Sequence, residues 1–218
     1  MEDRPDGDRY SPRAFLPNEV ESATQREMFR IASRTASWCN TQPWQVHAVS
    51  GDALSQLAES LTDQAETTDP APDFTLPRSY NGVYSERRRE AGFALYRALG
   101  ISRDDREARH DQLMKNYSFF GAPHTAIVTT DRDLGVFGAI DCGAFIANLL
   151  RAAHRLGVQT IPQAAIALYP RTVREVLAIP GDRLVVCAVS YGYADLSAPE
   201  NAVRTERAAV DDFVNVVS

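Results

Sequence analysis

The most strongly apolar part of the chain is the segment Gly138 to Ala165, and its pattern predicts a helix as far as Leu156. Apolar residues occupy most of the helical wheel, and apart from Asp141 the strongly polar residues, Arg151, His154 and Arg155, occur near the end. A helix that is apolar nearly all round is buried rather than half exposed. Two arrangements fit: a core helix within one subunit, or a helix that a partner subunit covers on one side. The segment is too short and too interrupted by polar groups to span a bilayer, which takes about 20 apolar residues.

The residues around Gly157 predict where this helix ends. Arg151 and Arg155 occupy its last turns, where cations complement the helix dipole. Gly157 readily adopts the left-handed conformation that terminates helices. The chain then continues as residues 159–165, which contain Pro162 and are expected to form a loop.

Five further helices are predicted, most of them from apolar residues at helical spacing. They are a helix capped by Asn18 and running to Ser33, a short helix over Leu54 to Leu61, Ser85 to Leu99, a solvated helix from Arg103 to Asn116, and Arg171 to Ala178. In the third of these helices, the residues expected to point inward are Phe93, Leu95, Tyr96 and Leu99.

Three segments have the pattern of β-strands. Residues 45–50 alternate in polarity, residues 124–130 follow a turn, and Leu184 to Ser190 form a continuous apolar run typical of a central strand. About six helices and three or four short strands, without a regular β-α alternation, indicate the α+β class, with helices around a small sheet.

A single domain is expected from residue 9 to residue 218. The charged residues 1–8 are expected to be a flexible N-terminal tail. The proline-rich segment 62–83 is the one candidate linker, but the part before it is too small to close a core alone. We therefore expect this segment to wrap a surface or to have a function of its own.

Composition and charge narrow the class of protein. Of the 218 residues, 44% are hydrophobic and 24% charged, which is ordinary for a globular protein, and the net charge is -6. This balance favours neither nucleic acid nor a membrane as a partner. Cys39, Cys142 and Cys187 are far apart and are expected to be buried thiols in a reducing cytosol. Because no leader-like segment opens the chain, we expect a cytoplasmic protein.

Common catalytic motifs do not occur in the chain. There is no dinucleotide-binding glycine motif and no Gly-x-Ser-x-Gly elbow. Gly138 and Gly143 have the spacing of a phosphate-binding loop, but Ala144 and Phe145 follow in place of Lys and Ser/Thr. The four histidines lack metal-ligand spacing, so no metal site is expected.

The segment Arg9-Tyr10-Ser11-Pro12-Arg13 is a candidate anion site. Guanidinium forks and a hydroxyl group suit phosphate oxygens. The alternative interpretation is an exposed basic segment, and the residues alone leave both open.

Four motifs in order resemble the FMN-dependent nitroreductase family, in particular its branch of 4-nitrobenzoate reductases. The first is Arg-x-Ser-x-Arg-x-Phe at residues 9–15, and the second is Ser-x-x-Asn-x-Gln-Pro-Trp at residues 37–44. The third is a Pro-Gln-Ala-Ala turn at residues 162–165, and the fourth is Arg-Thr-Glu-Arg at residues 204–207. The resemblance covers nearly the whole chain after residue 8. It implies a nitroreductase-like fold, with a small, mostly antiparallel sheet flanked by helices and a central buried helix at a dimer interface.

The resemblance implies that the two ends of the chain meet at the FMN phosphate. Arg9, Ser11 and Arg207 are expected to hold this phosphate, and Arg204 is a weaker candidate that a surface charge would equally explain. Tyr10 belongs to the same expected site, although it replaces a basic residue that is common in the family.

The resemblance also implies contacts with the flavin ring. Arg13 is expected at the N1/O2 edge, where a cation stabilises the negative charge that reduction adds. Asn40 is expected to bond the ring edge with Gln42 close by, although Gln42 would equally serve only to fix the following turn. Backbone groups of Pro162, Gln163 and Ala164 are expected near N5. Trp38, Phe119 and Phe120 are left open between pocket lining and core.

The activity implied is that of an FMN-dependent NAD(P)H oxidoreductase. A homodimer would reduce nitroaromatic or quinone-like acceptors by ping-pong hydride transfer through flavin N5. The alternatives are a protein that binds or sequesters FMN, or a flavin enzyme of the same fold with another reaction, such as flavin cleavage or dehalogenation.

Overall fold

A four-stranded antiparallel sheet lies at the centre of the structure, a computed structural model that describes residues 9–217. The predicted tail 1–8 therefore lies outside the described residues. The strand order is β1-β2-β4-β3. The strands are β1 Gln45–Ser50, β2 His124–Asp131, β3 Gln159–Gln163 and β4 Arg183–Gly192. The three predicted strands are all present, and β4 is a central strand, as predicted.

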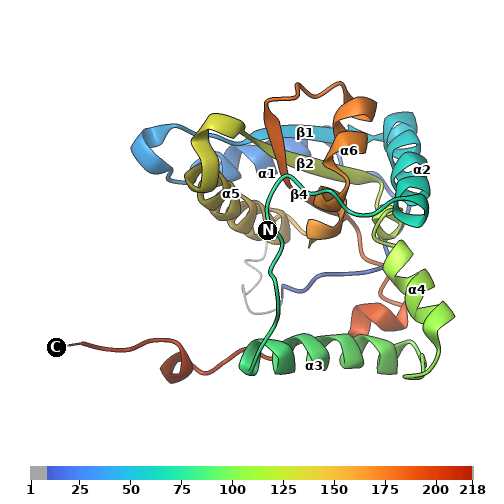
Figure 1. The fold of residues 1–218 in the computed structure, drawn as a ribbon. Coiled ribbons are helices and arrows are strands. Elements are labelled where there is room, and N and C mark those ends of the chain that lie inside the picture. The colour runs from blue at the N-terminus through green and yellow to red at the C-terminus, as the bar shows by residue number, and fades with distance from the viewer. Residues whose placement is uncertain (1–8, 218) are drawn as a thin grey trace.

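Helices cover both faces of this sheet (Figure 1). They are α1 Ser22–Ala32, α2 Gly51–Thr67, α3 Val83–Ala98, α4 Arg106–Met114, α5 Gly135–Arg155 and α6 Pro170–Leu177. Helices α1 and α5 pack with Val128 and Val189 of the sheet, whereas α2 and α6 pack with Ile127 and Val185. Neighbouring residues such as Ile127 and Val128 serve opposite faces because side chains alternate along a strand. This arrangement is the α+β fold that the sequence predicted.

The expectation of a loop at residues 159–165 was wrong. Residues 159–163 form strand β3, which pairs antiparallel with β4, and a 3-10 helix, Ala164–Leu168, follows. Proline is compatible with this strand because β3 lies at the edge of the sheet, where a missing N–H need not break a ladder. The pairing partner is distant in sequence, so the local pattern around Pro162 did not reveal it.

Several predicted helix boundaries are corrected. Asn18 is not an N-cap: α1 begins at Ser22, because the Val20 N–H is bonded to His124 Nε2 at 3.0 Å and Val20 is buried in the core. Helix α4 begins after Asp105, whose side chain accepts a hydrogen bond from the Ala108 N–H at 2.9 Å. The helix predicted over residues 54–61 is longer than expected and includes the first part of the candidate linker.

Helix α5 buries only one of its apolar faces within this chain. Cys142, Phe145 and Leu149 are buried against the sheet, whereas Phe137 is 51% and Ile140 59% exposed. The apolar pattern therefore describes a helix with a core side and an uncovered side.

The expectation that the α5 segment is too short to cross a membrane was wrong. Among the described residues, one helical stretch of 24 residues, Arg132–Arg155, has the length and a mean hydropathy of 1.5 that such a helix requires. A third of the apolar 18-residue stretch within this helix is buried inside the chain. A core helix meets the same length and composition criteria, and α5 packs on β2 and β3 in this fold.

Helix α3 does not contribute to the core as predicted. Phe93 is 42% exposed and no residue of the helix is buried. The helix lies apart from the sheet, at the bottom of Figure 1. Its neighbours within the chain are the short turn Pro199–Ala202, Arg109 of α4 over the Tyr96 ring, and residues 204–213, which share a cavity with it; together they leave the helix without a buried residue.

The cysteines are only partly as predicted. Cys142 is buried and Cys187 is partly buried, and burial raises the pKa of each thiol to about 11. Cys39 is exposed, contrary to the expectation of three buried thiols, because it lies in an irregular turn outside the core.

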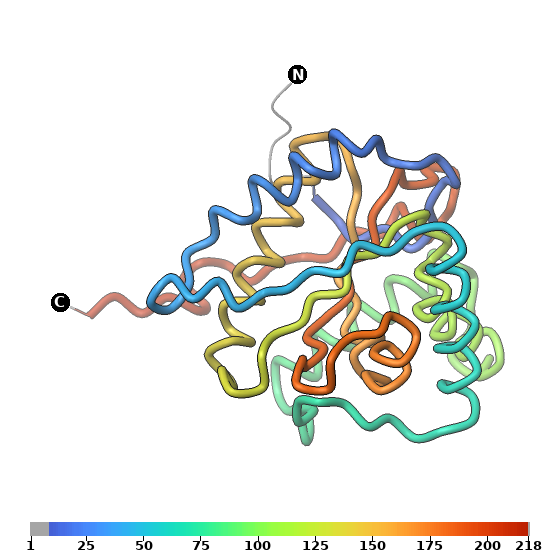
Figure 2. Tube along the Cα trace, turned by 90° about the horizontal axis from the view of Figure 1, so that it is seen from above, coloured from blue at the N-terminus to red at the C-terminus, as the bar shows by residue number. Residues whose placement is uncertain are grey.

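The candidate linker wraps around the domain and is held by one buried ion pair. Asp73 Oδ2 lies 2.6 Å from Arg174 Nη1 and also accepts a hydrogen bond from the Val185 N–H at 2.8 Å. This carboxylate joins the segment to both α6 and β4. Figure 2 shows the segment running along the outside of the domain.

His124 is expected to make stability depend on pH. Its ring is 3% exposed, stacks on Tyr191 and accepts the Val20 N–H, and burial lowers its pKa below the usual value. The unfolded chain therefore takes up the proton first, so stability is complete above about pH 6.5 and falls as the pH drops.

As the pH falls from about 7 to about 5, the unfolding free energy of the wild type should decrease. We expect this decrease to be smaller in His124→Gln, as measured by urea denaturation. The control is His110→Gln, because His110 is exposed on α4. Equal pH dependence of the wild type and His124→Gln would contradict this account.

Candidate functional site

The N-terminal motif is held beside the end of β4. The Leu16 N–H donates to the Tyr193 carbonyl at 2.8 Å, and Phe15 forms an isolated β-bridge with Ala194. These bonds place residues 9–13 next to the strand end, far from their position in the sequence.

Arg9, Tyr10 and Arg204 line a cavity of about 590 Å³ together with the beginning of β3. The Arg204 guanidinium carbon lies 3.6 Å from the centre of the Tyr10 ring, which is a close cation–π contact. Arg204 is exposed, but its guanidinium is fixed on Tyr10 at the wall of this cavity. Thr160 and Tyr193 contribute to the same wall.

Arg207 also lies near this group of cations. Burial lowers the pKa of Arg9, and repulsion by the Arg207 charge lowers it further. The Arg207 side chain is exposed and donates to the carbonyls of Thr205 and Glu206. The two ends of the chain thus bring like charges together, an arrangement that an anion would stabilise.

Arg13 is a partly buried cation without an acidic partner in the described part of the chain. Burial lowers its pKa, and among residues 9–217 its guanidinium forms no ion pair with a carboxylate. Its one side-chain bond goes to the Ser11 carbonyl at 3.4 Å, so the Ser11 backbone supports it. A negative charge brought to this position would be strongly stabilised because water is largely displaced there.

The residues predicted near flavin N5 lie in and just after the edge strand β3. Pro162 and Ala164 are exposed, whereas the Gln163 side chain is 2% exposed. Gln163 donates to the Asn116 carbonyl at 2.8 Å and accepts from Ser190 Oγ. Its side chain therefore holds the strand from inside, while backbone groups of the edge strand remain available to a ligand.

Asn40 and Gln42 are not brought to this cavity within one chain. They lie in a turn with positive φ values of 58° and 48°, and both are exposed. The Gln42 N–H donates to Ser37 Oγ at 2.9 Å and its side chain donates to the Asn40 carbonyl, so Gln42 does fix the turn. The turn packs against α5, and the ring centres of Trp38 and Phe137 are 4.6 Å apart.

The aromatic residues that were left open are now placed. Phe119 and Phe120 are buried in the core, at 1% and 6% exposure, whereas Trp38 is 60% exposed. Only Trp38 is therefore accessible to a ligand or to a partner chain.

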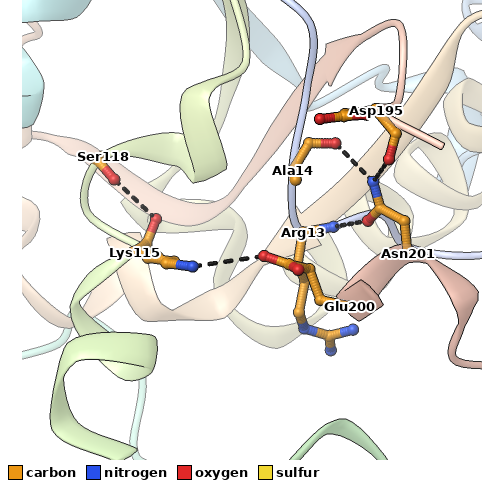
Figure 3. A network of polar contacts seen from close by, with 7 residues as sticks. All are labelled: Arg13, Ala14, Lys115, Ser118, Asp195, Glu200 and Asn201. Atoms are coloured by element: carbon orange, nitrogen blue, oxygen red, sulfur yellow. Dashed lines mark hydrogen bonds and ion pairs between the residues drawn. The ribbon is translucent and has the colours of Figure 1, made fainter. Parts of the chain in front are cut away.

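Asn201 has contacts that the sequence did not indicate (Figure 3). It lies next to Glu200, a buried carboxylate that Lys115 approaches to 3.4 Å, and it bonds the backbone of Arg13. Nothing in the local sequence distinguishes this asparagine from others in loops. Among the described residues there is also no cluster of three or more His, Cys, Asp or Glu that could hold a metal ion.

The fold and this cavity define an α+β protein with a cation-lined site beside a sheet edge. Residues 7–193 match the model of the nitroreductase family, and the chain belongs to that family. The matched range includes the first three predicted motifs but ends before Arg204 and Arg207. The family that the sequence resembled is therefore confirmed.

Individual relatives match along nearly their whole length. The chain is 36% identical to nitroreductase NfnB of Mycolicibacterium smegmatis, covering 94% of this chain and 87% of the relative. It is 35% identical to a 4-nitrobenzoate reductase of Nocardioides sp., with 94% and 85% covered.

Two solved structures share the fold closely. One is the FMN-dependent nitroreductase NfnB from Mycobacterium smegmatis in complex with NADPH, with a TM-score of 0.92, 35% identity, and 96% of this chain and 95% of that chain covered. The other is the FMN and NADPH-dependent nitroreductase NfnB from a Sphigopyxis strain, with a TM-score of 0.92, 30% identity and 96% of each chain covered.

Proposed function

We propose that this chain is an FMN-dependent, NADPH-oxidising nitroreductase that acts on nitroaromatic compounds. The observation that carries the proposal is the convergence of Arg9 and Arg204 beside the beginning of β3, with the Arg207 charge close to Arg9, in a chain that belongs to the nitroreductase family. Relatives named as NfnB and as 4-nitrobenzoate reductase support the cofactor, the reductant and the substrate class.

The residues present fit both parts of FMN, its phosphate and its flavin ring. A phosphate dianion would neutralise the repulsion between Arg9 and Arg207, and the Ser11 hydroxyl would add a neutral donor. Arg13 would face the part of the flavin that gains negative charge on reduction, because its own charge lacks an acidic partner among residues 9–217. The open edge of β3 suits the planar ring with its N–H and C=O groups.

The chain supplies orientation and electrostatics rather than the reacting group. When bound, FMN supplies the two-electron chemistry that links NADPH oxidation to reduction of the acceptor. Arg13 supplies a fixed cation, and Gln163 holds the backbone of residues 162–164 in position through Asn116 and Ser190. A cation that is already in place costs no reorganisation during the reaction.

The site also points to a homodimer. Asn40 and Gln42 do not line the cavity, and the apolar face of α5 around Phe137 and Ile140 is uncovered in one chain. A second copy seated on this face would bury it and would carry its own turn of residues 37–42 toward the flavin. The C-terminal residues extend away from the domain (Figure 1), and Val216 and Val217 are about 90% exposed, as expected of an arm that packs on a partner.

The activity is tested by anaerobic mixing of the purified holoprotein with NADPH. We expect the flavin absorbance to bleach, to return on addition of 4-nitrobenzoate, and to support steady-state turnover with parallel double-reciprocal plots. NADH in place of NADPH measures the preference for the reductant. A yellow protein that NADPH does not bleach would contradict the proposal and would favour a flavin-sequestering function.

The phosphate contact is tested by Arg9→Ala. Loss of a charged hydrogen bond costs about 1.5–3 kcal/mol, so FMN affinity should fall by about 10- to 100-fold in a fluorescence titration of the apoprotein. Arg171→Ala is the matched control, because Arg171 is an exposed arginine of α6 that pairs with Glu175 away from the cavity. An unchanged dissociation constant in Arg9→Ala would place the phosphate elsewhere.

The interface is tested by Ile140→Glu. A carboxylate in an apolar contact is costly to desolvate, so we expect a monomer in analytical ultracentrifugation, with reduced FMN retention. The control is Leu76→Glu, an exposed apolar residue of the segment that wraps the domain. A wild type that sediments as a monomer and still binds FMN would refute the dimer without refuting the activity.

A further inference from the structure

Asn201 joins two parts of the chain that are far apart in sequence (Figure 3). Its side chain is buried, with the residue 3% exposed. Its Oδ1 accepts a hydrogen bond from the Arg13 N–H at 2.6 Å, and its Nδ2 donates to the carbonyls of Ala14 at 2.8 Å and Asp195 at 2.7 Å. The amide thus bonds the N-terminal motif and the segment after β4 at the same time.

The three bonds require a carboxamide at this position. Asparagine offers one carbonyl acceptor and two N–H donors in a single plane, and all of them are used here. An aspartate would keep the acceptor but would lose both donors and bring a charge close to two carbonyl oxygens. Alanine would leave the Arg13 N–H and the Ala14 carbonyl without these partners inside the protein.

The same residue also supports a second cation of the site. The Asn201 main-chain carbonyl accepts a hydrogen bond from Arg204 Nη1 at 2.9 Å, and Arg204 stacks on Tyr10. Its neighbour Glu200 is bonded to Lys115, just beyond the end of α4, which anchors the turn from the other side. The turn Pro199–Ala202 is therefore a fixed point to which both Arg13 and Arg204 are attached.

We propose that Asn201 is a positioning residue that holds Arg13 and Arg204 at the flavin nucleotide. The inference rests on the proposed function, because it takes Arg13 as the cation at the flavin ring. Displacing Arg13 should affect reduced FMN more than oxidised FMN, since the reduced form carries more negative charge at the ring edge. A residue that served stability alone would weaken both forms equally or neither.

The test compares Asn201→Ala and Asn201→Asp with the wild type. The readouts are the dissociation constant of FMN for the apoprotein, the midpoint potential of the bound flavin and the melting temperature. For both variants we expect the dissociation constant of oxidised FMN to rise about tenfold. The dissociation constant of reduced FMN should rise by about a further factor of ten. That further loss corresponds to a potential about 30 mV more negative for a two-electron couple. Asn201→Asp retains the acceptor for the Arg13 N–H, so it keeps the test available if Asn201→Ala does not fold.

Asp73→Asn is the matched control for a general loss of stability. It weakens the buried pair with Arg174, away from the cavity, and should lower the melting temperature while leaving the flavin potential unchanged. Variants of Asn201 that melt earlier but keep the wild-type potential and FMN affinity would overturn the inference alone. A wild type without affinity for FMN would overturn the proposed function and this inference with it.

Discussion

The backbone hydrogen bonds between residues 14–16 and the segment after β4 are the constraint on which the site depends. Leu16 bonds Tyr193, and the Asp195 N–H bonds the Ala14 carbonyl at 3.1 Å. These bonds make the N-terminal segment a short addition to the end of the sheet, and they bring Arg9 and Arg13 to the base of the C-terminal arm. Without them, the basic residues at the two ends of the chain would remain separate surface charges.

Helices α1, α2 and α6 cover the sheet, whereas α5 both covers the sheet and leaves one side open for assembly. The core on one face of the sheet is closed by α2 and α6, and the other face is covered by α1 and the buried side of α5. The exposed side of α5 is apolar in its first turns, at Val136, Phe137 and Ile140, and there it adjoins the turn at Trp38, whose ring touches Phe137. The same helix therefore completes the interior of one chain and, in the proposed dimer, positions residues for the site of the other.

The sequence predicted those elements whose burial is visible in their own pattern of apolar residues. The run Leu184 to Ser190 is buried between two strands, and its continuous apolar pattern reflects this. Strand β3 was missed because its structure comes from pairing with β4, and Pro162 locally favours a loop. Of the residues predicted to point inward on α3, Phe93 is exposed and Leu95, Tyr96 and Leu99 are only partly buried, because helical spacing does not show whether a covering surface exists within the chain.

The candidate site was predictable only in part. Arg9 and Arg207 stand out as charges, but their proximity follows from tertiary structure, and only the family resemblance suggested it. The role of Asn201 could not be predicted from the sequence. Its side chain bonds carbonyl and N–H groups that are distant along the chain, and the residues next to it do not indicate these bonds.

Strand β3 illustrates how a site at a sheet edge is protected from unwanted strand addition. An open edge is a template for other chains, and proteins suppress this aggregation hazard with devices such as proline. Pro162, the one exposed residue of this five-residue edge strand, removes one backbone donor from it. A small planar molecule can still use the remaining groups, whereas an incoming strand would meet a broken ladder. In the proposed complex, the proline would thus favour a small ligand over a polypeptide at this margin of the sheet.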